Sequence, residues 1–152
     1  MAGLLFLDTS VLVAAERHRV PVEKIAQPDP EAWLAMSVIT VAELLQGLHR
    51  ARTDQQRQSR QSFIDHMLAR LELFPVDLAV AREQARIWAG LSERGEIIGP
   101  YDLIIAATAV AYSSPLATLN FREFQKVEGL EVLALSPTPT LRRQRGKSRE
   151  GE

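Results

Sequence analysis

The 152-residue sequence contains no cysteine, which excludes disulfide bonds and thiolate-ligated metal sites. It also has no apolar stretch near the roughly 18 residues that a membrane-spanning helix needs, so we expect no association with a membrane. The N-terminus Met1-Ala2-Gly3 has no basic segment before its short apolar run and does not resemble a signal peptide. We therefore expect a cytoplasmic protein.

Net charge is also small, −1 at pH 7, but it is unevenly distributed. The segment Leu141–Glu152 holds five basic and two acidic side chains and carries +3, which leaves −4 on residues 1–140. Such a basic tail could bind phosphate groups. We favour a solvated, disordered end, because charged termini flanked by proline seldom become ordered. The sequence therefore predicts one domain over residues 1–136 and a basic tail over residues 137–152.

Short apolar segments alternate along the chain with longer segments of helical periodicity. The predicted strands are residues 4–7, 34–40, 71–77, 115–119 and 130–135, and the predicted helices are residues 10–18, 41–51, 55–71, 78–95 and 101–112. Thr9 or Ser10 is placed to cap the first of these helices. Strands that alternate with helices are typical of the α/β class, with a parallel sheet covered by helices on both faces.

Three acidic residues lie in apolar surroundings where carboxylates are unusual. Asp8 ends the first predicted strand, Glu43 follows the second, and Asp102 begins the almost wholly apolar helix 101–112. Because the carboxyl ends of parallel strands meet at one edge of a sheet, we expect these junctions to lie together. For any one residue alone, a helix cap or an interaction with the helix dipole is the simpler explanation. Three converging carboxylates repel one another, however, and a divalent cation relieves that repulsion.

The chemistry of these acids indicates which ion and which reaction to expect. Carboxylate ligands suit Mg²⁺ or Mn²⁺ that keeps several of its waters. An ion held in this way usually serves phosphate chemistry. No pair of histidines has the spacing of a zinc site, and we interpret His18, His49 and His66 as surface residues, with a contact to RNA as the alternative for His49.

The segment TLNFREF, residues 118–124, follows a predicted strand and brings further polar side chains to the same edge. Thr118 could hold a water or a carboxylate through its hydroxyl, and Asn120 could donate to an acidic ligand or bind a metal through its oxygen. Glu123 could add a further carboxylate, directly or through a water. A simple turn in which Asn120 supplies local hydrogen bonds explains the same residues without a metal.

Four segments taken in order, LDTSVL, TVAELLQG, YDLIIAATAV and ATLNFREF, resemble the PIN-domain ribonucleases, and in particular the VapC toxins of bacterial type II toxin–antitoxin modules. The resemblance covers the chain up to about Ser136. It implies a PIN-like three-layer α/β/α sandwich around a central parallel sheet. It also implies that Asp8, Glu43 and Asp102 bind Mg²⁺ or Mn²⁺ for endonucleolytic cleavage of RNA, such as tRNA or rRNA. The implied partners are a VapB-type antitoxin, whose C-terminal segment blocks the site, and a second copy in a homodimer.

The sequence departs from the family at Asn120, where many PIN domains carry a fourth acid. Whether Glu123 replaces that acid stays open, as does the choice between one metal ion and two. In our hypothesis Asp8 and Asp102 hold the ion directly, and Glu43 orients the attacking water or binds the ion through water. The residues assigned a supporting role are Thr9, Ser10, Thr118 and Asn120.

Contacts with RNA and with a second copy are expected from residues outside the acidic set. Tyr101 could stack on a base, although packing is the simpler explanation. We interpret Trp33 and Trp88 as residues of the core or of a dimer interface. The tail residues that could hold the RNA backbone are Arg142, Arg143 and Arg145.

Other functions fit the sequence less well. A haloacid-dehalogenase-type phosphatase needs a second Asp where this chain has Ser10, and a lysine in the region between Lys24 and Lys126, where there is none. A receiver domain needs an acid pair after the first strand. A PIN-domain nuclease of RNA processing stays open as an alternative to a toxin. A PIN-like module that binds RNA or protein without cleavage also stays open, although three intact acids argue against it.

Overall fold

The computed structural model describes residues 3–135. A five-stranded sheet forms its centre, in the order β3-β2-β1-β4-β5, and every neighbouring pair is parallel. The strands are β1 (Leu4–Leu7), β2 (Trp33–Ser37), β3 (Glu72–Phe74), β4 (Leu116–Thr118) and β5 (Val132–Ala134). The helices are α1 (Thr9–His18), α2 (Val22–Ala26), α3 (Val38–His49), α4 (Asp54–Arg70), α5 (Leu78–Glu93), α6 (Pro100–Ala111) and α7 (Phe121–Phe124). The tail predicted over residues 137–152 lies outside the described residues.

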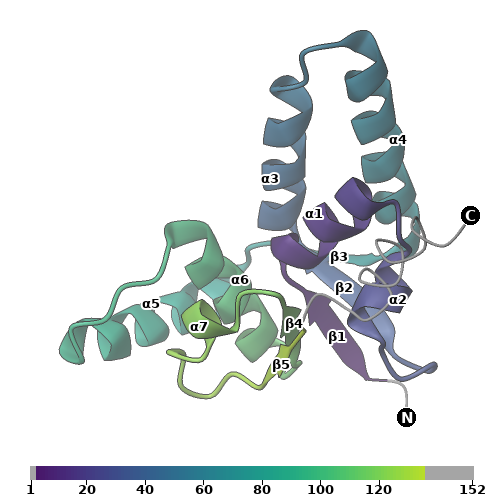
Figure 1. Cartoon of the computed structure of the whole chain (residues 1–152). Coiled ribbons are helices and arrows are strands. Elements are labelled where there is room, and N and C mark those ends of the chain that lie inside the picture. Colours follow the sequence, from purple (N-terminus) through teal and green to yellow (C-terminus); the bar gives the residue numbers. More distant parts are fainter. Residues whose placement is uncertain (1–2, 136–152) are drawn as a thin grey trace, which may run out of the picture.

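Helices cover both faces of this sheet (Figure 1). Successive residues of a strand point to opposite faces. In β1, Leu5 and Leu7 accordingly belong to the apolar cluster formed with α1–α4, whereas Phe6 belongs to the cluster formed with α5–α7. Burial on both faces explains why the strands are almost continuously apolar. The predicted α/β/α sandwich is confirmed, and no helix in residues 3–135 is long and apolar enough to cross a membrane.

The second strand is shorter than predicted. β2 ends at Ser37, whose hydroxyl accepts a hydrogen bond from the backbone N–H of Ile39 at 3.1 Å and so caps α3. The prediction of a strand through Thr40 is wrong. It relied on the preference of β-branched residues such as Val38 for strands, whereas the cap at Ser37 starts a helix at Val38. Glu43 therefore lies in the second turn of α3 rather than in its first.

The order of the strands places a switch in direction at the centre of the sheet. From β1 the chain moves outward through β2 and β3, and then returns to add β4 on the other side of β1. Sheets of this kind bind ligands at the carboxyl ends of the strands where the order reverses. Asp8 directly follows β1, and Thr118 is the last residue of β4. The backbone N–H of Asp8 donates to Ala117 O at 3.0 Å, which holds the two strand ends together.

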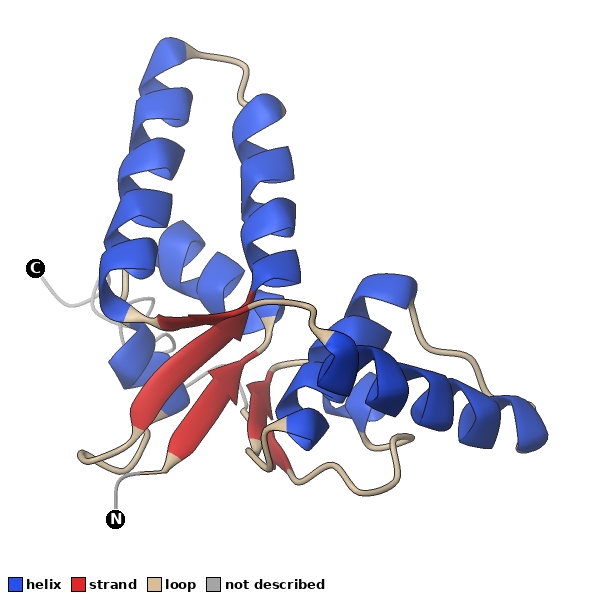
Figure 2. Cartoon of the chain, turned by 180° about the vertical axis from the view of Figure 1, so that it is seen from behind, coloured by secondary structure: helices blue, strands red, loops and turns tan. Residues whose placement is uncertain are grey.

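Figure 2 shows α3 and α4 as a pair of adjacent helices that projects away from the sheet. The side chain of Thr53 caps α4 by accepting a hydrogen bond from the backbone N–H of Gln56. Buried residues on the inner side of this pair include Leu44, Leu48 and Ile64, which join the cluster beneath α1. The pair and α1 together enclose a groove beside the carboxyl ends of the strands.

Candidate active site

Asp8 immediately precedes α1 and is buried, with 3% of its surface exposed. Its Oδ2 atom accepts hydrogen bonds from Ser10 Oγ at 2.6 Å and from Thr118 Oγ1 at 2.8 Å. Two hydroxyl donors on one oxygen fix the orientation of the carboxylate. The other oxygen, Oδ1, makes no hydrogen bond with a residue in the described part of the chain. That oxygen is therefore available to a further ligand.

The helix α1 begins differently from the prediction. Asp8 occupies the N-cap position, without a side-chain capping bond, and Thr9 is already the first helical residue. The prediction that Thr9 or Ser10 caps the helix is wrong, because both hydroxyls are directed to acids of the cluster instead. Ser10 Oγ also accepts a hydrogen bond from the backbone N–H of Leu119, which ties the segment after β4 to α1. Thr118 Oγ1 accepts one from the backbone N–H of Asn120.

Glu43 reaches the same edge from α3. Thr9 Oγ1 donates to Glu43 Oε1 at 2.8 Å and lies 3.0 Å from Thr40 Oγ1, so the start of α1 holds the carboxylate of α3. Burial raises the pKa of Glu43 above its usual value of 4.5, the hydrogen bond from Thr9 lowers it in part, and the charge of Asp8 raises it again. Because the charge of Asp8 acts on the pKa of Glu43, the two acids are close enough to interact.

Asp102 lies half-buried in the first turn of α6. Burial is the main cause that raises its pKa from 3.8 to about 6, followed by repulsion from Asp8, Glu43 and Glu123. A carboxylate with so high a pKa lacks a compensating positive charge. All three predicted acids, with Glu123 as a fourth, therefore share one electrostatic environment.

The fourth acid has a partner of its own. Glu123 lies on α7 and forms an ion pair of 3.3 Å with Lys126 Nζ, which also donates to Ile97 O at 3.2 Å. Lys126 thereby connects α7 to the loop that precedes α6. Asn120 is exposed, and its side chain forms no hydrogen bond with another described residue. Its backbone N–H donates a hydrogen bond to Thr118 Oγ1.

The donor set fits a hard divalent cation. Within residues 3–135, no basic side chain forms an ion pair with Asp8, Glu43 or Asp102. Buried carboxylates without cationic partners are costly, and oxygen ligands are those that Mg²⁺ and Mn²⁺ prefer. As the side chains stand, however, no three acids in this range are close enough to hold one ion together. Binding by three of them would require the carboxylates to approach one another.

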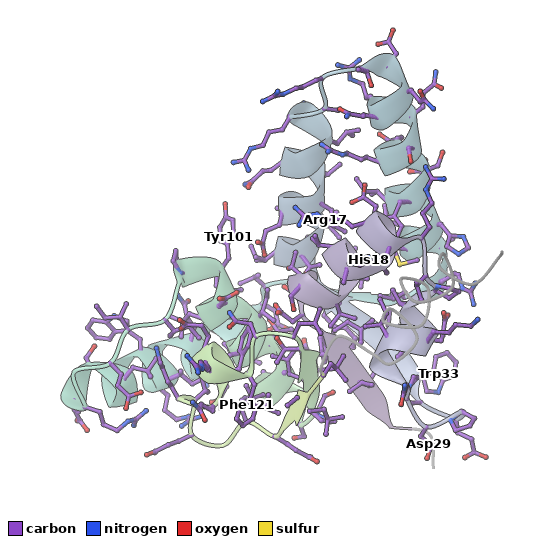
Figure 3. All side chains as sticks on the ribbon, in the orientation of Figure 1. Arg17, His18, Asp29, Trp33, Tyr101 and Phe121 are labelled. Carbon is purple, nitrogen blue, oxygen red and sulfur yellow. The ribbon has the colours of Figure 1, made fainter. Side chains whose placement is uncertain are left out.

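The other residues singled out in the sequence are Tyr101, two tryptophans, three histidines and three arginines of the tail. Tyr101 stands exposed at the start of α6, and its hydroxyl accepts a hydrogen bond from Gln46 Nε2 of α3 at 3.1 Å (Figure 3). Trp33 and Trp88 are 57% and 61% exposed, so they are not core residues, and a role in a dimer interface stays a prediction. The three histidines His18, His49 and His66 are on the surface, as predicted. Arg142, Arg143 and Arg145 lie outside the described residues.

Three polar residues near the acids were not predicted from the sequence. Thr40 and Gln46 lie one turn before and one turn after Glu43 on α3, and Lys126 lies three residues after Glu123. The spacing of three residues along a helix is the signal that could have identified them.

The sequence matches a known protein family over most of its length. The family model of the PIN domain matches residues 5–130. Ribonuclease VapC from Rickettsia bellii is 34% identical over 131 residues, which cover 86% of this chain and 96% of that protein. The tRNA(fMet)-specific endonuclease VapC from Shigella flexneri is 31% identical over 126 residues, which cover 83% of this chain and 93% of that protein.

A solved structure gives the same result for the fold. The structure of VapBC2 from Rickettsia felis bound to a promoter DNA fragment aligns with a TM-score of 0.75 and 27% identity, covering 86% of this chain and 98% of the matched chain. Family model, sequence identity and fold thus coincide over the residues that carry the four acids. The chain belongs to the PIN-domain family and, within it, to the VapC ribonucleases.

Proposed function

We propose that this chain is the toxin of a type II toxin–antitoxin module and cleaves RNA internally with the help of Mg²⁺ or Mn²⁺. The observation that carries the proposal is the uncompensated charge at the switch point of the sheet. Asp8, Glu43 and Asp102 influence one another there, and no basic residue of the described part neutralises them. A non-catalytic binding module has no evident use for such a costly arrangement.

Each acid has a distinct role in the proposed reaction. Asp8, held through Oδ2, would present Oδ1 to the ion, and Asp102 would contribute the second direct ligand. The bound ion would polarise the phosphoryl oxygen and lower the pKa of a coordinated water. Glu43, held by Thr9 and with a raised pKa, would orient the attacking water and accept a proton from it. The products would carry a 5′-phosphate and a 3′-hydroxyl.

Glu123 is the candidate for the acid that many PIN domains carry at the position of Asn120. Its charge acts on Asp102, which supports a place at the edge of the site. Lys126 neutralises part of that charge, so a contribution through a bridging water fits better than direct ligation. Fewer direct carboxylate ligands favour a single ion.

The proposed partners follow from the relatives. The similar structure from Rickettsia felis is a VapBC complex, and the relative from Shigella flexneri is named as an endonuclease specific for tRNA(fMet). We infer a VapB-type antitoxin that covers the acidic site, a structured RNA such as tRNA or rRNA as the substrate, and a setting in the cytoplasm. A homodimer stays part of the same proposal.

Cleavage of total cellular RNA tests the proposal directly. The purified protein, freed of antitoxin, is incubated with Mg²⁺, Mn²⁺ or EDTA beside the variant Asp102→Asn. Discrete fragments that disappear with EDTA and with the variant are the expected result, and sequencing of their ends identifies the target. Cleavage that persists in EDTA would contradict the metal-dependent mechanism. A folded protein that neither cleaves RNA nor binds Mn²⁺ would contradict the function as a whole.

A further inference from the structure

A groove leads away from the acidic site between α1 and the α3–α4 pair. Its first part is a pocket of about 360 Å³, and Glu43 forms part of its wall together with Arg17 of α1, Arg50 after α3 and Arg60 of α4. Because Glu43 belongs to both, the pocket opens directly beside the proposed reaction centre. Figure 3 shows Arg17 on α1, next to the α3–α4 pair.

The groove continues beyond this pocket. A second hollow of about 350 Å³ shares Glu16, Arg17 and Arg60 with the first and adds Arg19 at the end of α1. Its remaining wall comes from polar residues of the first turns of α4. The two hollows therefore form one path, which runs from the acids along α1 to the amino-terminal end of α4.

The charges along this path have an excess of positive sign. Arg17, Arg19, Arg50 and Arg60 face two acids, Glu16 and Glu43, which leaves a balance of +2. Arg60 is engaged, since it lies 3.8 Å from Glu16 Oε1 and donates to Gly47 O. Among the described residues no acid pairs with the other three arginines.

Unpaired guanidinium groups are suited to phosphate, because their planar fork donates two parallel hydrogen bonds. We propose that a single RNA strand reaches the acidic site along this groove, with its phosphates bound by Arg17, Arg19 and Arg50. The inference rests on the proposed function and assigns it a substrate path. A row of positive groups that ends at acids also explains how a polyanion approaches a negatively charged centre.

A protein partner in the same groove is the competing interpretation. The floor of the first pocket is apolar, with Leu44, Phe63 and Ile64, and would accept an amphipathic segment. The second hollow, however, is lined by charged and polar side chains alone, those of three arginines, two glutamines, one serine and Glu16. Because arginines without an ion-pair partner among the described residues line both halves of the path, a polyanion can be bound along its whole length, which favours RNA.

Binding of RNA without cleavage tests the path. A short fluorescein-labelled single-stranded RNA is titrated in EDTA, over a series of salt concentrations, with the parent protein and with Arg17→Ala/Arg50→Ala. The matched control is Arg82→Ala, an exposed arginine on α5 outside the groove. A double variant Arg17→Lys/Arg50→Lys keeps the charge, and circular dichroism verifies that every variant is folded.

The groove variant is expected to bind RNA about 100-fold more weakly than the parent at low salt, and the slope of log K against log salt is expected to fall by about 0.7 for each lost phosphate contact. The lysine variant should recover most of the affinity, and Arg82→Ala should bind like the parent. Equal loss in the groove variant and in Arg82→Ala, or no loss in either, would overturn the proposed path and leave the groove to a protein partner.

The same experiment separates this inference from the proposed function. If the parent protein cleaves RNA while the groove variant binds RNA normally, only the path is wrong. If binding depends on Arg17 and Arg50 but the parent never cleaves RNA with Mg²⁺ or Mn²⁺, the path is supported and the nuclease function fails.

Discussion

Replacing Asp102 by Asn should make the protein more stable while it abolishes the proposed activity. At neutral pH the carboxylate is ionised although burial and three neighbouring acids oppose its charge. Asparagine has nearly the same shape and no charge, so the variant removes both the repulsion from the neighbouring acids and the cost of burying a charge, and it keeps the packing. The acid is thus expected to be retained for function at a cost in stability.

The magnitude follows from the pKa of Asp102. A rise from 3.8 to about 6 corresponds to roughly 3 kcal/mol at about 1.4 kcal/mol for each pH unit. Because the side chain is only half-buried, solvent screens the repulsion, and we expect about 1–2 kcal/mol of added stability. For a chain of this size such a gain raises Tm by roughly 2–8 °C.

The stability difference between the two proteins should depend on pH in a defined direction. A carboxyl group with a raised pKa contributes stability that is complete below the unfolded value of 3.8 and is lost as the pH rises through about 6. The parent should therefore gain stability relative to Asp102→Asn as the pH falls, and the advantage of the variant should be about half as large at pH 5 as at pH 7.5.

The assay is urea unfolding of both proteins in EDTA at the two pH values, repeated with Mg²⁺. Ligand that binds only the folded state stabilises it, so Mg²⁺ should raise the stability of the parent and have much less effect on the variant. An Asp102→Asn protein that is less stable than the parent at pH 7.5, or whose advantage does not change with pH, would refute the electrostatic reasoning.

Three further substitutions test the contacts around the site and the fold. Thr118→Val should cost about 1.5–3 kcal/mol, because it removes a buried hydroxyl that donates to Asp8, and Thr118→Ser in the same urea titration should keep most of the stability. Ser37→Ala should cost about 1 kcal/mol in thermal unfolding through the lost cap of α3, with Ser37→Thr as the variant that keeps a capping hydroxyl. Tyr112→Phe removes the hydrogen bond that lowers the pKa of Asp77, so its destabilisation should be present at neutral pH and disappear as the pH falls through that lowered pKa; a loss that is equal at both ends of the pH range would exclude the carboxylate as its source.

The parallel sheet could be predicted because burial on both faces demands continuous apolar strands, such as Leu4–Leu7. The acids could be located because a carboxylate in apolar surroundings, above all Asp102, is costly without a partner. The end of β2 could not be predicted in the same way. Val38 and Ile39 fit a strand as well as a helix. The start of α3 is set by the hydrogen bond between the Ser37 hydroxyl and the backbone N–H of Ile39.

The sequence by itself determined the fold class, the family and the three acids, since these depend on local pattern and on the chemistry of single residues. The tertiary structure alone decided how the acids are held and what surrounds them. The hydroxyls of Ser10 and Thr118 converge on Asp8 from segments 108 residues apart, and Arg17 and Arg50 line one groove from different helices. Such contacts arise because the sheet brings β1 beside β4 and the helices pack over it, and no spacing along the chain records them.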